Sequence, residues 1–147
     1  MGRVVGIDPG EARIGLAISD ETRSIAFPRE TVDAKEGRAK ALSRVREALA
    51  HDEVSLAVVG LPLRLDGSEG EAARRARAFG GALAETLGVE VVYCDERLTT
   101  VAAERSVQEM GRRGSRRREV VDQSAASSWL QGYLDAQSGG AGTSPRS

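Results

Sequence analysis

The stretch that decides the fold is Arg3-Val4-Val5-Gly6-Ile7-Asp8-Pro9-Gly10, a short Val/Ile run that ends in an acid and a turn. Such a run predicts a β-strand that is buried on both faces of a sheet. Alternating apolar residues predict a second strand over residues 13–19 and a third around residues 27–32. Three strands joined by short turns indicate an antiparallel meander.

Farther along the chain, apolar residues recur at helical spacing. This pattern predicts four helices, over residues 36–50, from about 72 to 83, around 103–110 and over 118–136. Two further strands are expected between them, at residues 56–60 and 89–94. Strand-helix-strand units pair their strands in parallel through right-handed crossovers. The expected α/β fold is therefore one mixed five-stranded sheet, with three antiparallel strands, then parallel additions, and helices on both faces.

One domain is expected over residues 1–136, followed by a Gly/Ser-rich tail at 137–147 that is predicted to be disordered. The segment Ser68-Glu69-Gly70-Glu71 has the S-x-x-E spacing of a capping box, which predicts a helix start at Ser68. The free N–H groups of such a helix start would be available to a phosphate.

The composition, with 40% apolar and 29% charged residues, is typical of a globular protein without a membrane span. The chain has a single cysteine, Cys94, and its start does not resemble a secretory signal, so a cytoplasmic location is expected.

A net charge of −1 argues against tight, non-specific binding of nucleic acid. An arginine cluster is nevertheless positioned to contact phosphates, although by itself it reads equally well as a solvated loop. The cluster consists of Arg112, Arg113, Arg116, Arg117 and Arg118.

Carboxylates lie at the ends of two predicted strands. Asp8 ends the first strand, where a carboxylate costs several kcal/mol of desolvation unless a cation or a donor meets it; the alternative is an Asx turn. Asp95 and Glu96 end the fifth strand. The carboxyl ends of parallel strands meet at one edge of a sheet, where ligands gather. Because side chains alternate, only one of Asp95 and Glu96 can share a face with Asp8, and the pattern alone favours Glu96 only slightly.

A third acid, Asp122, lies on the last predicted helix in one stripe with Ala126, Trp129 and Tyr133. This stripe is otherwise apolar or aromatic, so it is expected to pack on the sheet. Asp122 either serves the helix dipole or projects toward Asp8. Three converging acids would repel one another unless cations neutralise them.

Oxygen ligands suit Mg²⁺ or Mn²⁺ rather than zinc. The single histidine, His51, is expected on the surface, and Cys94 is expected in the core. Without a nucleophilic side chain, the natural chemistry is metal-assisted hydrolysis, in which two ions about 4 Å apart activate water at a phosphodiester.

Several blocks, taken together, resemble the YqgF/RuvX family. They are residues 5–10, 13–17 with Ser19-Asp20, Val59-Gly60-Leu61-Pro62-Leu63, residues 66–70, Asp95-Glu96-Arg97-Leu98-Thr99-Thr100, and Asp122 with Ala125-Ala126. They occur in order over nearly the whole chain. Two positions depart from the family pattern. Ala12 stands where relatives carry a basic residue, and Pro9 is more typical of RuvC resolvases.

The resemblance implies an RNase H-like fold and a cytoplasmic nuclease that acts in 5′-end maturation of pre-16S rRNA. It implies that the acidic triad is Asp8, Glu96 and Asp122. Under this reading, Arg13 and Arg97 steady phosphates near the metals, and the Ser68 helix start and the arginine cluster bind the backbone farther out. The expected partners are pre-rRNA or branched DNA, and the pre-ribosomal small subunit.

Three alternatives remain. A Holliday-junction resolvase would need a homodimer for paired cuts, whereas an rRNA nuclease need not be dimeric. A non-catalytic RNA-binding assembly factor would gain nothing from three converging acids. An actin-like or sugar-kinase-like ATPase would need about twice this length, and the turn after Asp8 lacks the Lys-Ser/Thr of a P-loop.

Overall fold

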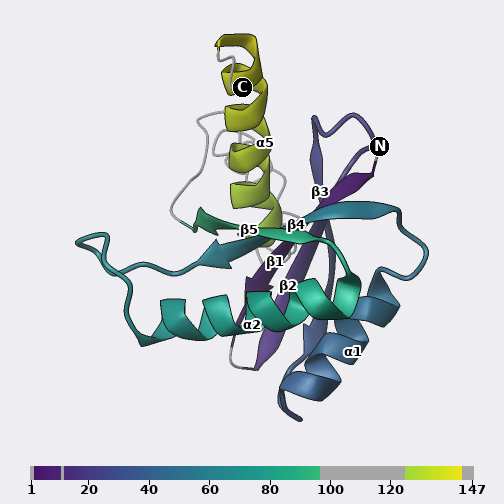
Figure 1. The fold of residues 1–147 in the computed structure, drawn as a ribbon, viewed down its shortest axis with the longest axis vertical. Helices are drawn as coiled ribbons and strands as arrows, with labels where there is room; N and C mark the ends of the chain where they lie inside the picture. The colour runs from purple at the N-terminus through teal and green to yellow at the C-terminus, as the bar shows by residue number, and fades with distance from the viewer. Residues whose placement is uncertain (1, 11, 97–124, 144–147) are drawn as a thin grey trace, which may run out of the picture.

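The computed structural model describes residues 2–10, 12–96 and 125–143. Five strands and three helices lie in these ranges (Figure 1). In chain order they are β1 (Arg3–Pro9), β2 (Arg13–Ser19), β3 (Ala26–Asp33), α1 (Arg38–Ala48), β4 (Val54–Leu61), α2 (Glu71–Leu87), β5 (Glu90–Asp95) and α5 (Ala125–Thr143). The predicted helix around residues 103–110 and the start of the last predicted helix lie outside the described residues.

The strands form one sheet in the order β3-β2-β1-β4-β5. The pairs β1–β2 and β2–β3 are antiparallel, whereas β1–β4 and β4–β5 are parallel. The predicted meander followed by parallel additions is therefore confirmed. Because β1, β4 and β5 run in the same direction, their carboxyl ends meet at one edge of the sheet.

Helices cover both faces of the sheet, as predicted. On one face, α1 and α2 pack on a core that includes Val5, Ile7 and Val59. On the other face, α5 packs on alternate residues of the same strands, such as Val4 and Val58 (Figure 1). This alternation explains why the central strands read as continuous apolar runs, because both of their faces are buried.

Helix α2 begins later than the capping-box pattern predicts. Its N-cap is Gly70, and no side chain caps it. The hydroxyl and the backbone N–H of Ser68 both donate to Asp66 Oδ1, at 2.7 and 2.9 Å. The prediction of a helix start at Ser68 was wrong because a local turn with Asp66 uses the serine instead.

Helix α5 continues to Thr143, beyond the predicted end at residue 136. The backbone of residues 137–143 is helical, and residues 144–147 lie outside the described part, so the disorder expected for the tail at 137–147 stays a prediction. Extending an existing helix adds one hydrogen bond for each residue fixed, so packing at Ala126, Trp129 and Leu130 supports a helix that runs on into a Gly/Ser-rich sequence. In the described ranges, no helix is both long enough and apolar enough to cross a membrane.

Candidate active site

Asp8 lies at the carboxyl end of β1, directly opposite Gly15 of β2, and is half-buried. The chain then turns through Pro9 and Gly10, whose N–H donates to the carbonyl oxygen of Arg13 at 2.9 Å. A Cβ atom at Gly10 would lie 2.7 Å from that oxygen, so this turn requires glycine. The turn holds Asp8 at the edge of the sheet.

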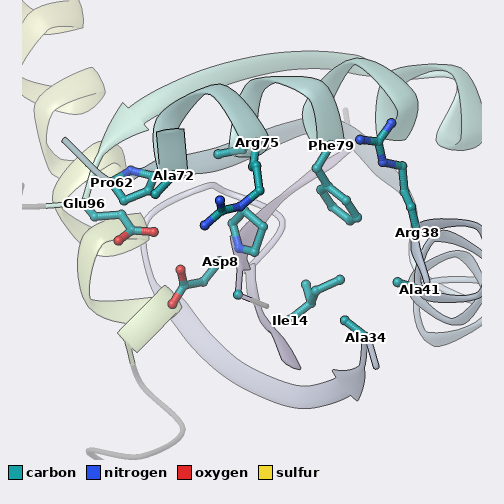
Figure 2. Close-up of a pocket in the computed structure, with 13 residues that line it drawn as sticks. Asp8, Ile14, Ala34, Arg38, Ala41, Pro62, Ala72, Arg75, Phe79 and Glu96 are labelled. Atoms are coloured by element: carbon teal, nitrogen blue, oxygen red, sulfur yellow. The ribbon is translucent and has the colours of Figure 1, made fainter. Parts of the chain in front are cut away.

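Glu96 directly follows β5, and its backbone N–H donates to Leu61 O at 3.3 Å. Cys94 is buried on the α5 face, so alternation gives Glu96 that face and Asp95 the other. The Glu96 side chain occupies the space above Gly60, where a Cβ atom would lie 2.8 Å from both Cγ and Oε2 of Glu96. The structure thus brings Glu96, and not Asp95, to Asp8 (Figure 2).

The two carboxyl groups of Asp8 and Glu96 share a hydrogen bond. Burial, this hydrogen bond and repulsion from Asp8 and Asp95 raise the pKa of Glu96 to about 8. Without a cation the pair therefore keeps a proton at neutral pH. A divalent cation would stabilise both carboxylates in their charged form, because an opposite charge at close range lowers a carboxyl pKa.

The third predicted acid, Asp122, lies outside the described residues, as do Arg97 and the cluster of Arg112, Arg113, Arg116, Arg117 and Arg118. Within the described ranges, no group of three acidic, histidine or cysteine side chains could hold a metal ion. The oxygen donors of Asp8 and Glu96 fit the preference of Mg²⁺ or Mn²⁺ and account for two of the expected ligands.

Two predicted phosphate contacts lie in the described part. Arg13 is exposed at the start of β2, one strand away from Asp8 and at the same edge of the sheet. Ser68 is exposed as well, but its N–H and hydroxyl are already bonded to Asp66. Among the described residues, Arg13 is thus exposed where it could reach a phosphate, whereas Ser68 gives no helix-start site.

A pocket of about 550 Å³ opens beside the two carboxylates and extends between α1 and α2 (Figure 2). Asp8 and Glu96 lie at one end, and an apolar floor lies at the other. Two arginines, Arg38 of α1 and Arg75 of α2, also line it. The floor is formed by Ile14, Ala34, Ala41, Ala76 and Phe79.

Sequence reasoning missed Arg38 and Arg75. Arg75 is exposed and lies outside the buried stripe of α2, which includes Ala76, Phe79 and Leu83, so the sequence gives no clear signal for it. Arg38 is the first residue of α1 and gives no clear signal either. Only the packing of α1 beside α2 brings the two side chains to one pocket.

The expected structural roles of Cys94 and His51 are confirmed. Cys94 is buried, and burial raises the pKa of its thiol to about 11, so it is not a nucleophile at neutral pH. His51 is exposed in the turn after α1. Trp129 is buried against the sheet, with Tyr133 packed beside it.

Two curated proteins illustrate what this chain is similar to in sequence. A protein named "Putative pre-16S rRNA nuclease" from Nocardioides sp. is 47% identical over 139 residues, covering 90% of this chain and 87% of that protein. One of the same name from Agathobacter rectalis is 43% identical over 135 residues, with coverage of 90% and 94%.

Among solved structures, Thermus thermophilus RuvC in complex with a Holliday junction matches with a TM-score of 0.59 at 21% identity, covering 95% of this chain and 97% of RuvC. Another structure of the same RuvC gives 0.58 at 22% identity, covering 93% and 96%. These likenesses show an RNase H-like fold. The family model described as "RuvX: Holliday junction resolvase" matches residues 2–136. The chain belongs to the RuvX family.

Proposed function

We propose that this protein is a metal-dependent nuclease that hydrolyses phosphodiester bonds during 5′-end processing of pre-16S rRNA. Its relatives at 43–47% identity carry the name of that activity. The single observation that carries the proposal is the Asp8–Glu96 pair, two hydrogen-bonded carboxyl groups at the mouth of an open pocket. A carboxyl pair that retains a proton until a cation arrives suits metal binding better than a structural role.

Mg²⁺ or Mn²⁺, bound as two ions, would be held by Asp8, Glu96 and Asp122. The divalent metals that are general among RuvC-type nucleases support this assignment. When bound, the ions would supply an activated water and would neutralise charge on the leaving oxygen. Asp8 and Glu96 would hold the ions from fixed positions, since the pairing of β1 and the bond from Glu96 N–H to Leu61 O position the backbone at both residues.

Arginines would bind the substrate backbone. Arg13 is exposed at the same edge of the sheet as Asp8, and Arg75 reaches into the pocket beside the carboxylates (Figure 2). Arg97 and the arginine cluster at residues 112–118 complete the proposed binding surface. The proposed partners are pre-rRNA and the pre-ribosomal small subunit in the cytoplasm, and the monomer suffices for one cut.

The substitution Asp8→Asn tests the proposal. It removes one metal ligand but keeps the size of the side chain, so cleavage should fall by about 10³-fold or more while the thermal unfolding midpoint changes little. Glu85→Gln is the matched control, since Glu85 is exposed on α2 and does not line the pocket. Full cleavage by the Asp8→Asn protein would remove Asp8 from the mechanism.

The description of the matching family and the fold of RuvC favour a second candidate, a Holliday-junction resolvase that acts on branched DNA. Structured pre-rRNA and four-way DNA junctions, assayed side by side with Mg²⁺, Mn²⁺ and EDTA, separate the two functions. Solution mass adds to this test because paired junction cuts need a dimer. Metal-independent binding without any product would instead indicate a non-catalytic assembly factor.

A further inference from the structure

The apolar end of the pocket has no part in metal binding. Its floor consists mostly of buried side chains, among them Ile14 and Phe79, together with the half-buried Ala34. A phosphate or a metal ion gains nothing from such a surface. The pocket volume of about 550 Å³ lies within the range of sites that hold small organic groups.

Positive charge lies beside this floor. Arg38 is exposed and lines the pocket, and in the described part of the chain it has no hydrogen-bond or ion-pair partner. Its helix has no acidic residue in the first turn, and its N-cap, Gly37, makes no side-chain capping bond. The preceding acid, Glu36, is paired with Arg44 at 2.6 Å and with Lys40 at 3.9 Å. This end of the pocket therefore favours an anion.

Arg75 lies between the two ends. It extends from α2 into the pocket, between Phe79 and the carboxylates (Figure 2). Among its contacts is an exposed ion pair with Glu71, at 3.6 Å, and exposed pairs of this kind are weak. A planar guanidinium at this position can stack on a flat ring or bind a phosphate.

In order, the pocket thus presents a pair of metal-binding carboxylates, an arginine, an apolar floor and a second arginine. In a nucleotide chain two successive phosphates flank one ribose, and the base, which has apolar faces, branches from that ribose, so two phosphates and one base lie close enough together to meet these groups. We infer that the pocket is a subsite for one unstacked nucleobase adjacent to the cleaved phosphodiester, with Arg38 binding the neighbouring phosphate. This inference rests on the proposed nuclease function and adds a substrate class to it.

The consequence is a requirement for an unpaired nucleotide. A base in a duplex is stacked and paired and does not enter a pocket, whereas single-stranded segments offer bases that proteins stack on arginine planes and apolar side chains. The substrate would accordingly be single-stranded at the nucleotide next to the cut.

The test measures the dissociation constant of a short fluorescent single-stranded RNA in Ca²⁺, so that binding is followed without turnover. The variant Ala34→Phe fills the apolar end from a half-buried position whose backbone bond to Ala12 O is kept. Ala78→Phe is the matched control, since Ala78 is exposed on α2 outside the pocket. We expect Ala34→Phe to weaken binding about tenfold or more and Ala78→Phe to leave it unchanged.

Two further arms do not depend on the folding of Ala34→Phe. Arg38→Ala should weaken binding of the same RNA, while Arg46→Ala, on the same helix and outside the pocket, should not. For the wild-type protein, an abasic residue scanned along the RNA should weaken binding at one position by about tenfold. The fully paired duplex should bind equally well to wild type and to Ala34→Phe.

The opposite results would overturn the inference. These are an abasic scan without any sensitive position, or an Ala34→Phe protein that loses single-stranded and duplex RNA to the same extent. Cleavage assays in Mg²⁺ and Mn²⁺ separate this failure from that of the nuclease proposal. A folded wild-type protein that cuts no substrate would overturn the nuclease function, whereas active protein without base dependence would overturn only the subsite.

Discussion

The two ends of the pocket are built in different ways. Backbone register fixes the acidic end, because β1 and β4 pair in parallel and the Glu96 N–H bonds to the last residue of β4. The arginine end is formed by side chains of α1 and α2, two helices that are separated by β4 in the chain. A small displacement of the carboxylates at the acidic end should therefore reduce cleavage strongly. Substitutions at the arginine end should have smaller effects.

The difference matches the chemistry that each end would perform. Metal-assisted hydrolysis needs its ligands held to within a fraction of an ångström, so it benefits from strand ends and a glycine beneath the carboxylate. Holding a base or a phosphate by arginine needs only a charged or flat group within reach. Substitutions at the two ends should differ accordingly in the size of their effects.

The largest effect is expected from Glu96→Gln. This change retains the shape of the protonated side chain but removes a metal ligand, so cleavage should fall by about 10³-fold. Since burial and Asp8 already favour the neutral form of Glu96, the stability of the metal-free protein should be equal to or above that of wild type. Cleavage rates and urea unfolding together test both parts. A variant that cuts normally would show that the acidic end does not bind the catalytic ions.

The next effect concerns the glycine beneath the carboxylate. In Gly60→Ala the new Cβ would lie 2.8 Å from Glu96 Cγ and 2.9 Å from Trp129 Cζ2, so one of these side chains must move. We expect a loss of cleavage of about 10²-fold and a loss of stability of about 1–3 kcal/mol.

Gly81→Ala is the control for that experiment, because a Cβ at Gly81 meets nothing within 4 Å. Gly81 lies inside α2, where alanine should raise stability by about 0.5–1 kcal/mol. Equal behaviour of the two variants would show that Gly60 has no special role in placing Glu96.

Arg75 lies between the acidic end and the arginine end of the pocket (Figure 2), and Arg75→Ala should have a mild effect. Loss of one phosphate contact should weaken RNA binding and reduce the slope of log affinity against log salt by about 1. Arg46→Ala, with an exposed arginine away from the pocket, should leave that slope unchanged. Salt titrations of the dissociation constant measure both. If Arg75→Ala abolished cleavage without any change in RNA affinity, Arg75 would act in the cleavage step rather than in binding of the RNA backbone.

The remaining effect, which requires no substitution, is a pH dependence of stability. The folded pKa of Glu96, about 8, is above its ordinary value of 4.5, so the folded protein binds more protons than the unfolded chain between these values. The stabilisation from this group is therefore present below about pH 4.5 and is lost as the pH rises through about 8.

Urea midpoints of the metal-free protein across this range should show this loss, and Glu96→Gln should reduce it. Saturating Mg²⁺ should restore stability at the upper end of the range, because it binds the charged form. A pH profile identical for wild type and Glu96→Gln would mean that the Asp8–Glu96 pair does not hold a proton.

Much of the fold follows from local patterns. Short Val/Ile runs and alternating apolar residues located all five strands. A strand buried on one face has an apolar residue at every second position, and a strand buried on both faces is apolar throughout. The predicted start of α2 at Ser68 failed because Asp66, two residues away, competes for the same serine. The predicted end of α5 at residue 136 was too early, because an existing helix is extended at the cost of fixing only one residue for each new hydrogen bond.

The sequence by itself determined the strand order in the chain, the positions of Asp8 and Glu96 at strand ends, and the family. These properties depend on period, turn chemistry and motifs, which are local. Only the tertiary structure decided that Glu96 and not Asp95 meets Asp8 by geometry, that Gly60 makes room for Glu96, and that Arg38 and Arg75 share one pocket. The reason is physical: such contacts join residues that are distant in the chain, and their distances are set by how helices pack on a sheet.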